Sequence, residues 1–249
     1  MRRTAHAATA AAILAAGLAA CSTLTGVTSP ADARAAAAED HKPRGPVDCT
    51  TATCVALTFD GGPSAPTPDL LDILKKEKVP ATFFLQGKGH TEKYPQTIRR
   101  MAAEGHEIAN HTWSHKDLTA LNDDQIRAEV LPVQKDIEKV TGKAPVLMRP
   151  PQGTTNDKVS KVLKDLGLAQ ILWSVTAKDY ATTDTALIKQ RVLDQTGRDG
   201  IILLHERYAG TIPAVPDIIR DLRARGFTFV TVSQLMSPAR PQPGKVYRP

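Results

Sequence analysis

Apolar positions along residues 54–236 follow two patterns in turn. Short apolar runs, typical of buried strands, are separated by longer stretches with apolar residues three or four positions apart, typical of helices. The predicted strands are 55–59, 81–85, 106–109, 146–148, 169–173, 200–204 and 227–232. The predicted helices are 68–78, 94–104, 123–141, 157–166, 183–196 and 214–225. Strands and helices that alternate in this way predict an α/β fold with a parallel sheet, which can remain open or close as a barrel.

Residues 1–20 have the pattern of an export signal. A basic start, Arg2-Arg3, is followed by a small apolar stretch that is too short to span a membrane. The stretch ends in Leu18-Ala19-Ala20-Cys21, which resembles the lipobox of bacterial lipoproteins, whose cysteine becomes the lipidated first residue. We therefore expect a lipid on Cys21 that anchors the chain on the extracytoplasmic side of a cell membrane. The alternative is an ordinary secretory signal with a chance cysteine, and the protein is then secreted.

The rest of the chain divides into three parts. Residues 21–48 are rich in Ala, Thr, Ser and charged residues without a clear apolar period, and we expect a flexible tether. Residues 49–236 hold all the predicted strands and helices and form one domain. Residues 237–249 contain four prolines and no periodicity, and we expect a proline-rich tail.

Cysteine usage agrees with an exported protein. The chain has three cysteines, and lipidation of Cys21 leaves Cys49 and Cys54 in a compartment that permits disulfides. We predict a disulfide between these two, just before the first strand. Two free thiols are the alternative, and no histidine flanks them as a metal site would require.

Composition limits the partners. Hydrophobic residues make up 41% of the 249 residues and charged residues 23%, which excludes a wholly disordered chain. The net charge of +6 is mild and fits a solvated basic surface or attraction to an anionic cell wall or membrane face. Basic runs interleaved with aromatic residues are missing from the sequence, so we expect no nucleic-acid partner. We also expect a monomer.

Chemically versatile side chains follow four of the predicted strands. Asp60 follows the first strand, Asn110 and His111 the third, Arg149 the fourth, and His205 the sixth. In a βα fold these positions converge at the carboxyl ends of the strands, where active sites lie. Four such positions on separate strands predict an active site, because burying charge without partners is costly.

His111 and His115 form a candidate metal pair. If their segment turns helically, residues four apart face the same way and both imidazoles can bind one cation. A carboxylate from another strand would normally complete such a site.

Five segments occur in an order that resembles a known family. They are Thr58-Phe59-Asp60-Gly61-Gly62-Pro63, His111-Thr112-Trp113-Ser114-His115, Arg149-Pro150-Pro151-Gln152-Gly153, Asp179-Tyr180 and Leu203-Leu204-His205-Glu206. Together they resemble the motifs of the NodB-like polysaccharide deacetylases, carbohydrate esterase family four, over about residues 54–236. The resemblance implies a distorted (β/α) barrel of about seven parallel strands and a divalent metal, zinc first, with cobalt or manganese as alternatives. It also implies removal of N-acetyl, sometimes O-acetyl, groups from polymers such as chitin, peptidoglycan or xylan.

The resemblance also implies roles for single residues. Asp60 matches the general base and Arg149 the residue that orients it and keeps it ionised. His205 matches the general acid and Asp179 the carboxylate that orients His205. His111 and His115 match metal ligands, and the backbone N–H of Gln152 matches an oxyanion donor. Trp113, Trp173 and Tyr180 are candidates for stacking on sugar rings. For Trp173, a role in the hydrophobic core is at least as good an explanation.

The sequence departs from the family pattern at its metal site. The family has a second aspartate as metal ligand directly after the base, and here this position is Gly61. Gln152 replaces a tyrosine, Tyr180 a tryptophan, and Glu206 an aspartate. Three outcomes are open: waters fill the empty positions of the metal, Asp60 itself ligates the metal, or the protein binds glycans without turnover.

We expect an enzyme, because the base, the acid and their partners are all present. The predicted activity is metal-dependent removal of N-acetyl groups from a chitin- or peptidoglycan-like polysaccharide. An O-acetyl esterase on the same fold and a non-catalytic glycan-binding lipoprotein are the alternatives.

Overall fold

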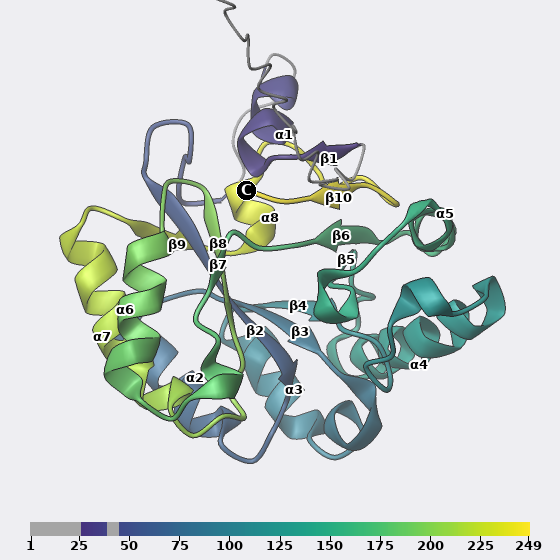
Figure 1. Ribbon diagram of the computed structural model, residues 1–249, viewed down its shortest axis with the longest axis horizontal. Coiled ribbons are helices and arrows are strands. Elements are labelled where there is room, and N and C mark those ends of the chain that lie inside the picture. Colours follow the sequence, from purple (N-terminus) through teal and green to yellow (C-terminus); the bar gives the residue numbers. More distant parts are fainter. Residues whose placement is uncertain (1–25, 39–44) are drawn as a thin grey trace, which may run out of the picture.

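The computed structural model describes residues 26–38 and 45–249, in which parallel strands form one curled sheet with helices packed around it (Figure 1). The strands are β1 Val27–Thr28, β2 Cys54–Gly62, β3 Thr82–Leu85, β4 Glu107–Asn110, β5 Leu147–Met148, β6 Ala169–Ile171, β7 Val175–Thr176, β8 Gly200–Leu204, β9 Thr228–Val230 and β10 Val246–Tyr247. The helices are α1 Pro30–Ala37, α2 Thr67–Glu77, α3 Pro95–Ala103, α4 Asp123–Thr141, α5 Asp157–Asp165, α6 Thr185–Gln195, α7 Thr211–Ala224 and α8 Val232–Leu235. Short helical segments lie at Gly87–Thr91, Leu118–Ala120, Pro151–Gly153 and Asp179–Ala181.

The sheet is parallel throughout and stays open. Its order is β1-β10-β6-β5-β4-β3-β2-β8-β7, and β9 pairs with the first residues of β2 on the edge that β3 uses further along. Within the described residues, β1 and β7 are the two edges and do not pair with each other. The predicted α/β class is therefore confirmed, with the barrel curled as a half-barrel rather than closed.

Alternation along β2 separates two cores. Val55, Leu57 and Phe59 point to the outer face, where they pack in the larger core with α2, α3, α6 and α7. Cys54 and Ala56 point to the inner face, which α8 and Tyr247 cover. Thr58 and Asp60 continue this inner face toward the carboxyl end of the strand. The same alternation that buries the outer core therefore aims Asp60 into the curl of the sheet.

Helix α4 shows why the bounds of some elements could be predicted accurately from the sequence. Asn122 accepts from the backbone N–H of Gln125, and the Gln125 side chain accepts from the N–H of Asn122, which closes a capping box. Gly142, at φ 74°, ends the helix in the left-handed conformation that favours glycine. The predicted bounds, 123–141, agree with the structure for this reason.

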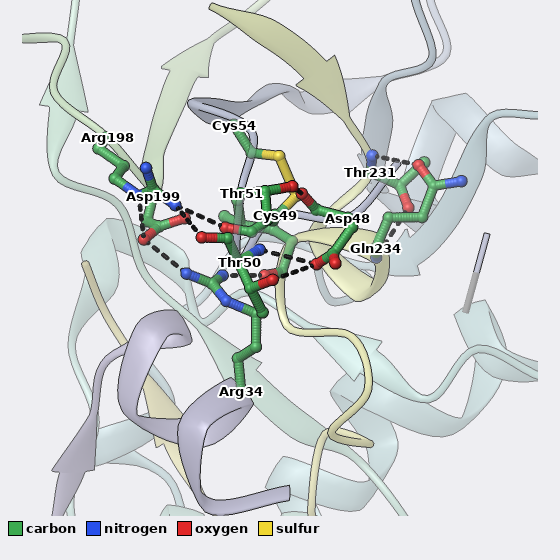
Figure 2. The surroundings of a disulfide bond; sticks show 11 residues. Arg34, Asp48, Cys49, Thr50, Thr51, Cys54, Arg198, Asp199, Thr231 and Gln234 are labelled. Carbon is green, nitrogen blue, oxygen red and sulfur yellow. Dashed lines mark hydrogen bonds and ion pairs between the residues drawn. A yellow bond between two sulfur atoms is a disulfide. The ribbon is translucent and has the colours of Figure 1, made fainter. Parts of the chain in front are cut away.

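The segment expected to be a flexible tether is partly ordered. Ser29 caps α1 by accepting from the N–H of Asp32, and β1 pairs with β10. Arg34 of α1 is only 6% exposed, and its guanidinium donates to the carbonyl of Leu235 over 2.7 Å and to Asp199 over 2.8 Å (Figure 2). The prediction of a flexible tether is therefore wrong for β1 and α1. The sequence did not reveal this order, because a buried, paired arginine and a two-residue strand produce no apolar period.

The predicted disulfide is confirmed between Cys49 and Cys54, with a sulfur–sulfur distance of 2.04 Å (Figure 2). The predicted tail is also more ordered than expected, since β10 pairs with β6 as well as with β1. Residues 1–20 and Cys21, on which the export signal and the lipid anchor depend, lie outside the described residues. Among the helices of the described ranges, none combines the length and apolar character that a membrane crossing requires.

Candidate active site

Asp60 and Arg149 form a buried ion pair at the inner face of the sheet. Arg149 follows β5 and is fully buried, and its Nη1 donates to Asp60 Oδ1 over 2.7 Å and to Thr58 Oγ1 over 2.8 Å. Its Nε donates to the carbonyl of Ile171, and its guanidinium lies 4.0 Å from the ring centroid of Phe84. Burial lowers the pKa of Arg149, and the Asp60 carboxylate opposes that shift. A guanidinium nevertheless stays protonated at neutral pH, so the pair is ionic and fixes the Asp60 carboxylate.

His111 is held as a neutral imidazole beside this pair. Its Nδ1 lies 2.8 Å from the carbonyl oxygen of Arg149, which can only accept, so Nδ1 carries the proton. Burial lowers the pKa of His111 to about 4, against the opposing effect of Asp60. Its Nε2 is consequently an unprotonated nitrogen at neutral pH, and it lies 3.8 Å from Asp60 Oδ2.

His111 and His115 come together without a helical turn. Their ring centroids are 4.9 Å apart, yet the backbone between them is irregular, with φ of 68° at Thr112 and 60° at His115. Two contacts hold this loop: Asn110 Oδ1 accepts from the N–H of Thr112, and buried Glu129 accepts from both the N–H and the hydroxyl of Ser114. The predicted juxtaposition of the rings is confirmed, whereas the helical turn expected to produce it is not present.

His205 and Asp179 form a second pair, after β8 and β7. His205 Nδ1 lies 2.8 Å from Asp179 Oδ1, and the backbone N–H of His205 donates to Asp179 Oδ2. Thr211, the first residue of α7, donates its hydroxyl to the same Oδ2 over 2.8 Å. The carboxylate is buried while the imidazole reaches solvent, so the outward Nε2 of His205 is the atom that can exchange a proton.

The Asp60–Arg149 pair and the His205–Asp179 pair both influence His115 electrostatically. The pKa of His115 is lowered first by burial and then by the guanidinium of Arg207, with Asp60 raising it and His205 lowering it further. Because such effects fall off over short distances, the base side and the acid side both face His115.

Predicted sugar contacts lie at different depths. Tyr180 is 57% exposed with its ring 6.1 Å from that of His205, and Gln152 is exposed at φ 55°. Trp113 is half-buried against Gly87, where an added Cβ would lie 2.2 Å from its ring. Trp173 is half-buried against Gly153 in the same manner. Of the three predicted aromatic side chains, Tyr180 is therefore the one best placed to meet a sugar ring beside His205.

Glu206 is buried close to Asp60 and His205. Its side chain is buried, Oε1 accepts from Thr67 Oγ1 over 3.1 Å, and Oε2 has no hydrogen-bond partner among the described residues. A Cβ at Gly62 would lie 1.6 Å from Oε1, so this glycine makes room for the carboxyl group. Burial raises the pKa of Glu206 to about 7.

The residues present do not complete a divalent metal site. His111 Nε2 and the adjacent His115 ring are suitable imidazole donors, but a side chain at Gly61 is missing, and a Cβ there would lie 3.4 Å from Nη1 of Arg207. Across residues 26–38 and 45–249, no group of three or more His, Cys, Asp or Glu side chains is arranged to hold a metal ion. Glu206, the residue after His205, does not join the histidines in such a group.

Four residues that support the site were not predicted from the sequence. Glu129 left a detectable signal, because it lies among the apolar positions of α4, three residues after Ile126 and one before Val130. Thr58, Thr211 and Arg207 left none, since a threonine in a strand or at a helix start, or an exposed arginine, is ordinary.

Known proteins resemble this chain over the domain that carries the site. A model of the polysaccharide deacetylase family matches residues 47–171. The peptidoglycan-N-acetylmuramic acid deacetylase PdaC of Bacillus subtilis is 41% identical over 73% of this chain, which corresponds to 38% of the length of that relative.

Solved structures agree in fold. The T48 deacetylase with substrate has a TM-score of 0.77 and 38% identity, over 81% of this chain and 99% of the other. A mutant of BA3943, a CE4 family pseudoenzyme with restored enzymatic activity, has a TM-score of 0.71 and 27% identity, over 81% of this chain and 74% of the other. Family model, sequence identity and fold agree, and the chain therefore belongs to the polysaccharide deacetylase family, carbohydrate esterase family 4.

Proposed function

We propose that this protein removes N-acetyl groups from a cell-wall polysaccharide of the peptidoglycan or chitin type, outside the cytoplasm. The observation that carries the proposal is the presence of two fixed pairs near His115: His205 with Asp179, a proton donor, and Asp60 with Arg149, a proton acceptor. The activity named for the Bacillus relative supports the substrate class.

Asp60 acts as the general base in this proposal. Arg149 binds Oδ1, which leaves Oδ2 to accept a proton from a water molecule. The oxygen of that water bonds to the acetyl carbonyl carbon, and its proton passes to Asp60. Gln152 supplies the backbone N–H to the resulting oxyanion, and Tyr180 and Trp113 line the sugar.

His205 acts as the general acid. Asp179 and Thr211 fix the ring so that Nδ1 faces inward and Nε2 faces the substrate. As the carbon–nitrogen bond breaks, Nε2 gives its proton to the leaving nitrogen, because an amine anion is too poor a leaving group. The products are acetate and the free amino sugar.

Metal dependence, with zinc or alternatively cobalt or manganese at His111 and His115, remains a prediction from the resemblance. Within the described residues the third protein ligand of such a site is absent, and a guanidinium lies in contact distance of position 61.

An O-acetyl esterase is the second candidate, and Gly61 is the observation that favours it. An alcohol leaves more easily than an amine, so an ester requires less activation of its carbonyl than an amide does. A glycan-binding protein without turnover is the third candidate, which the pseudoenzyme of the same fold illustrates.

Acetate release tests these candidates directly. We would incubate the purified protein with N-acetylglucosamine oligomers, peptidoglycan and acetylated xylan, with EDTA or with added Zn²⁺, Co²⁺ or Mn²⁺, and use His205→Ala as the control. We expect acetate from the N-acetylated polymers and none from the control. Release from xylan alone would support the esterase, and binding without release under every condition would contradict enzymatic function.

The lipid anchor on Cys21, the membrane location and a monomeric state are also proposals. Mass spectrometry of the mature N-terminus and membrane partition of Cys21→Ser test the anchor, and light scattering tests the monomer. An unmodified Cys21 in the membrane-free fraction would show that the protein is secreted.

A further inference from the structure

Arg207 occupies the space into which a side chain at position 61 would extend. Gly61 is near the end of β2 at φ 80°, and an added Cβ would lie 3.4 Å from Nη1 and 3.6 Å from Cζ of Arg207. The side-chain oxygen of Gln86 lies on the same side, 3.9 Å from that Cβ. A positive group therefore lies in contact distance of any side chain at position 61.

The charge of Arg207 is not neutralised by any residue of the ranges 26–38 and 45–249. Its contacts are with Tyr208, whose hydroxyl accepts from Nη2 over 3.2 Å and whose ring centroid lies 5.1 Å from Cζ. In the described ranges, no carboxylate lies within ion-pair distance of Arg207, and the side chain is exposed. The guanidinium is consequently available to an oxygen ligand from solvent.

This arrangement reverses the electrostatics that a divalent cation requires. Replacing a carboxylate by glycine removes a negative charge, and the nearby guanidinium adds a positive one that repels a second cation. A guanidinium has the planar donor geometry that matches a carboxylate, so the same position attracts an anion.

We propose that Arg207 substitutes for the divalent metal: its guanidinium excludes the metal from the His111–His115 pair and binds a small carboxylate, such as acetate, beside His205. The inference rests on the proposed function in one respect only: a deacetylated polysaccharide would be the source of the acetate. Its tests measure binding, so a failure of hydrolysis and a failure of this inference are distinguishable.

Metal exclusion is tested by zinc titration calorimetry on four proteins: the wild type, Gly61→Asp, Arg207→Gln and the double variant. In Gly61→Asp the new carboxylate pairs with Arg207, so we expect less than a tenfold gain in zinc affinity. In the double variant the carboxylate is free to bind metal, and we expect a gain of about 10- to 100-fold or more, well above the product of the single gains.

Two results would overturn metal exclusion. One is zinc affinity in Gly61→Asp equal to that of the double variant, and the other is wild-type zinc affinity equal to that of the double variant. If aspartate at φ 80° prevents folding, Arg207→Gln alone still decides, because an unchanged zinc affinity in that variant contradicts the inference.

Acetate binding is tested by an NMR titration with sodium acetate. We expect Arg207→Gln to weaken the dissociation constant at least fivefold, whereas Arg99→Gln, which changes an exposed arginine of α3, leaves it unchanged. Equal acetate affinity in wild type and Arg207→Gln would overturn carboxylate binding by Arg207.

Discussion

Asp179 binds His205 twice: one carboxylate oxygen lies 2.8 Å from Nδ1 of the imidazole, and the other accepts from the backbone N–H of the same residue. The ring and the main chain of His205 are thus fixed by one carboxylate. A substitution at Asp179 releases both at once, so its effect on the reaction is larger than the loss of one hydrogen bond.

Asp179→Asn is expected to lower kcat of acetate release by about 10²- to 10⁴-fold, because an amide no longer fixes the tautomer of His205. Initial rates on the best N-acetylated substrate measure the effect. Thr211→Val serves as the matched control, since it removes only one of the three hydrogen bonds to Asp179 and should cost far less. Equal losses in both variants would contradict the role given to Asp179.

Asp60→Asn is expected to lower the free energy of unfolding by about 3–5 kcal/mol, because the buried guanidinium of Arg149 loses its counter-charge. Urea denaturation measures the change. In the double variant Asp60→Asn/Arg149→Met both charges of this pair are removed, and we expect much of the stability to return. A single variant as stable as the wild type would show that the pair is not the main support of Arg149.

Glu206→Gln is expected to change the pH dependence of stability. Burial raises the folded-state pKa of Glu206 from 4.5 to about 7, so the folded protein binds its proton more tightly than the unfolded chain does. The resulting stabilisation is complete below about pH 4.5 and is lost as the pH rises through 7. At 1.36 kcal/mol for each pH unit between these values, the loss is about 3 kcal/mol.

The measurement is the difference in unfolding free energy between wild type and Glu206→Gln across pH 4.5 to 8. A glutamine does not titrate, so the variant should gain on the wild type as the pH rises. A difference that stays constant with pH would exclude a raised pKa at Glu206.

Arg34→Met is expected to lower the free energy of unfolding by about 1–3 kcal/mol, because Asp199 is left buried, and among the residues that the structure describes its remaining cationic neighbour is Arg198 at 3.7 Å. Hydrogen exchange should show the largest loss of protection in β1 and α1. Arg99→Gln, on the surface of α3, is the control and should leave exchange in β1 unchanged. Uniform loss over the whole sheet would indicate global destabilisation instead.

The sequence was sufficient to predict the bounds of elements that are determined by their own residues, such as an apolar run or a helix cap. The apolar run of β8 and the capped, glycine-ended α4 agree with their predicted bounds because each is determined by its own residues. Asp60, Arg149 and His205 were also predictable, since each lies at or just after the carboxyl end of a strand and parallel strands end at one edge.

Features that depend on distant partners were not predictable. β1 and β10 have two residues each and exist only because they pair with each other and with β6. The positive φ at Thr112 and His115 depends on Asn110 and Glu129, and the position of Arg207 opposite Gly61 depends on how β2 and the loop after β8 are juxtaposed.

β10 lies between β1 and β6, so the last strand of the chain separates the first strand from the rest of the sheet. During synthesis, Val27 and Thr28 emerge long before Val246 and Tyr247, the residues with which they pair. Strand β1 therefore cannot pair with β10 until the C-terminal residues have been synthesised. Removal of the final few residues would take the pairing partner from β1 and from β6 in a single step.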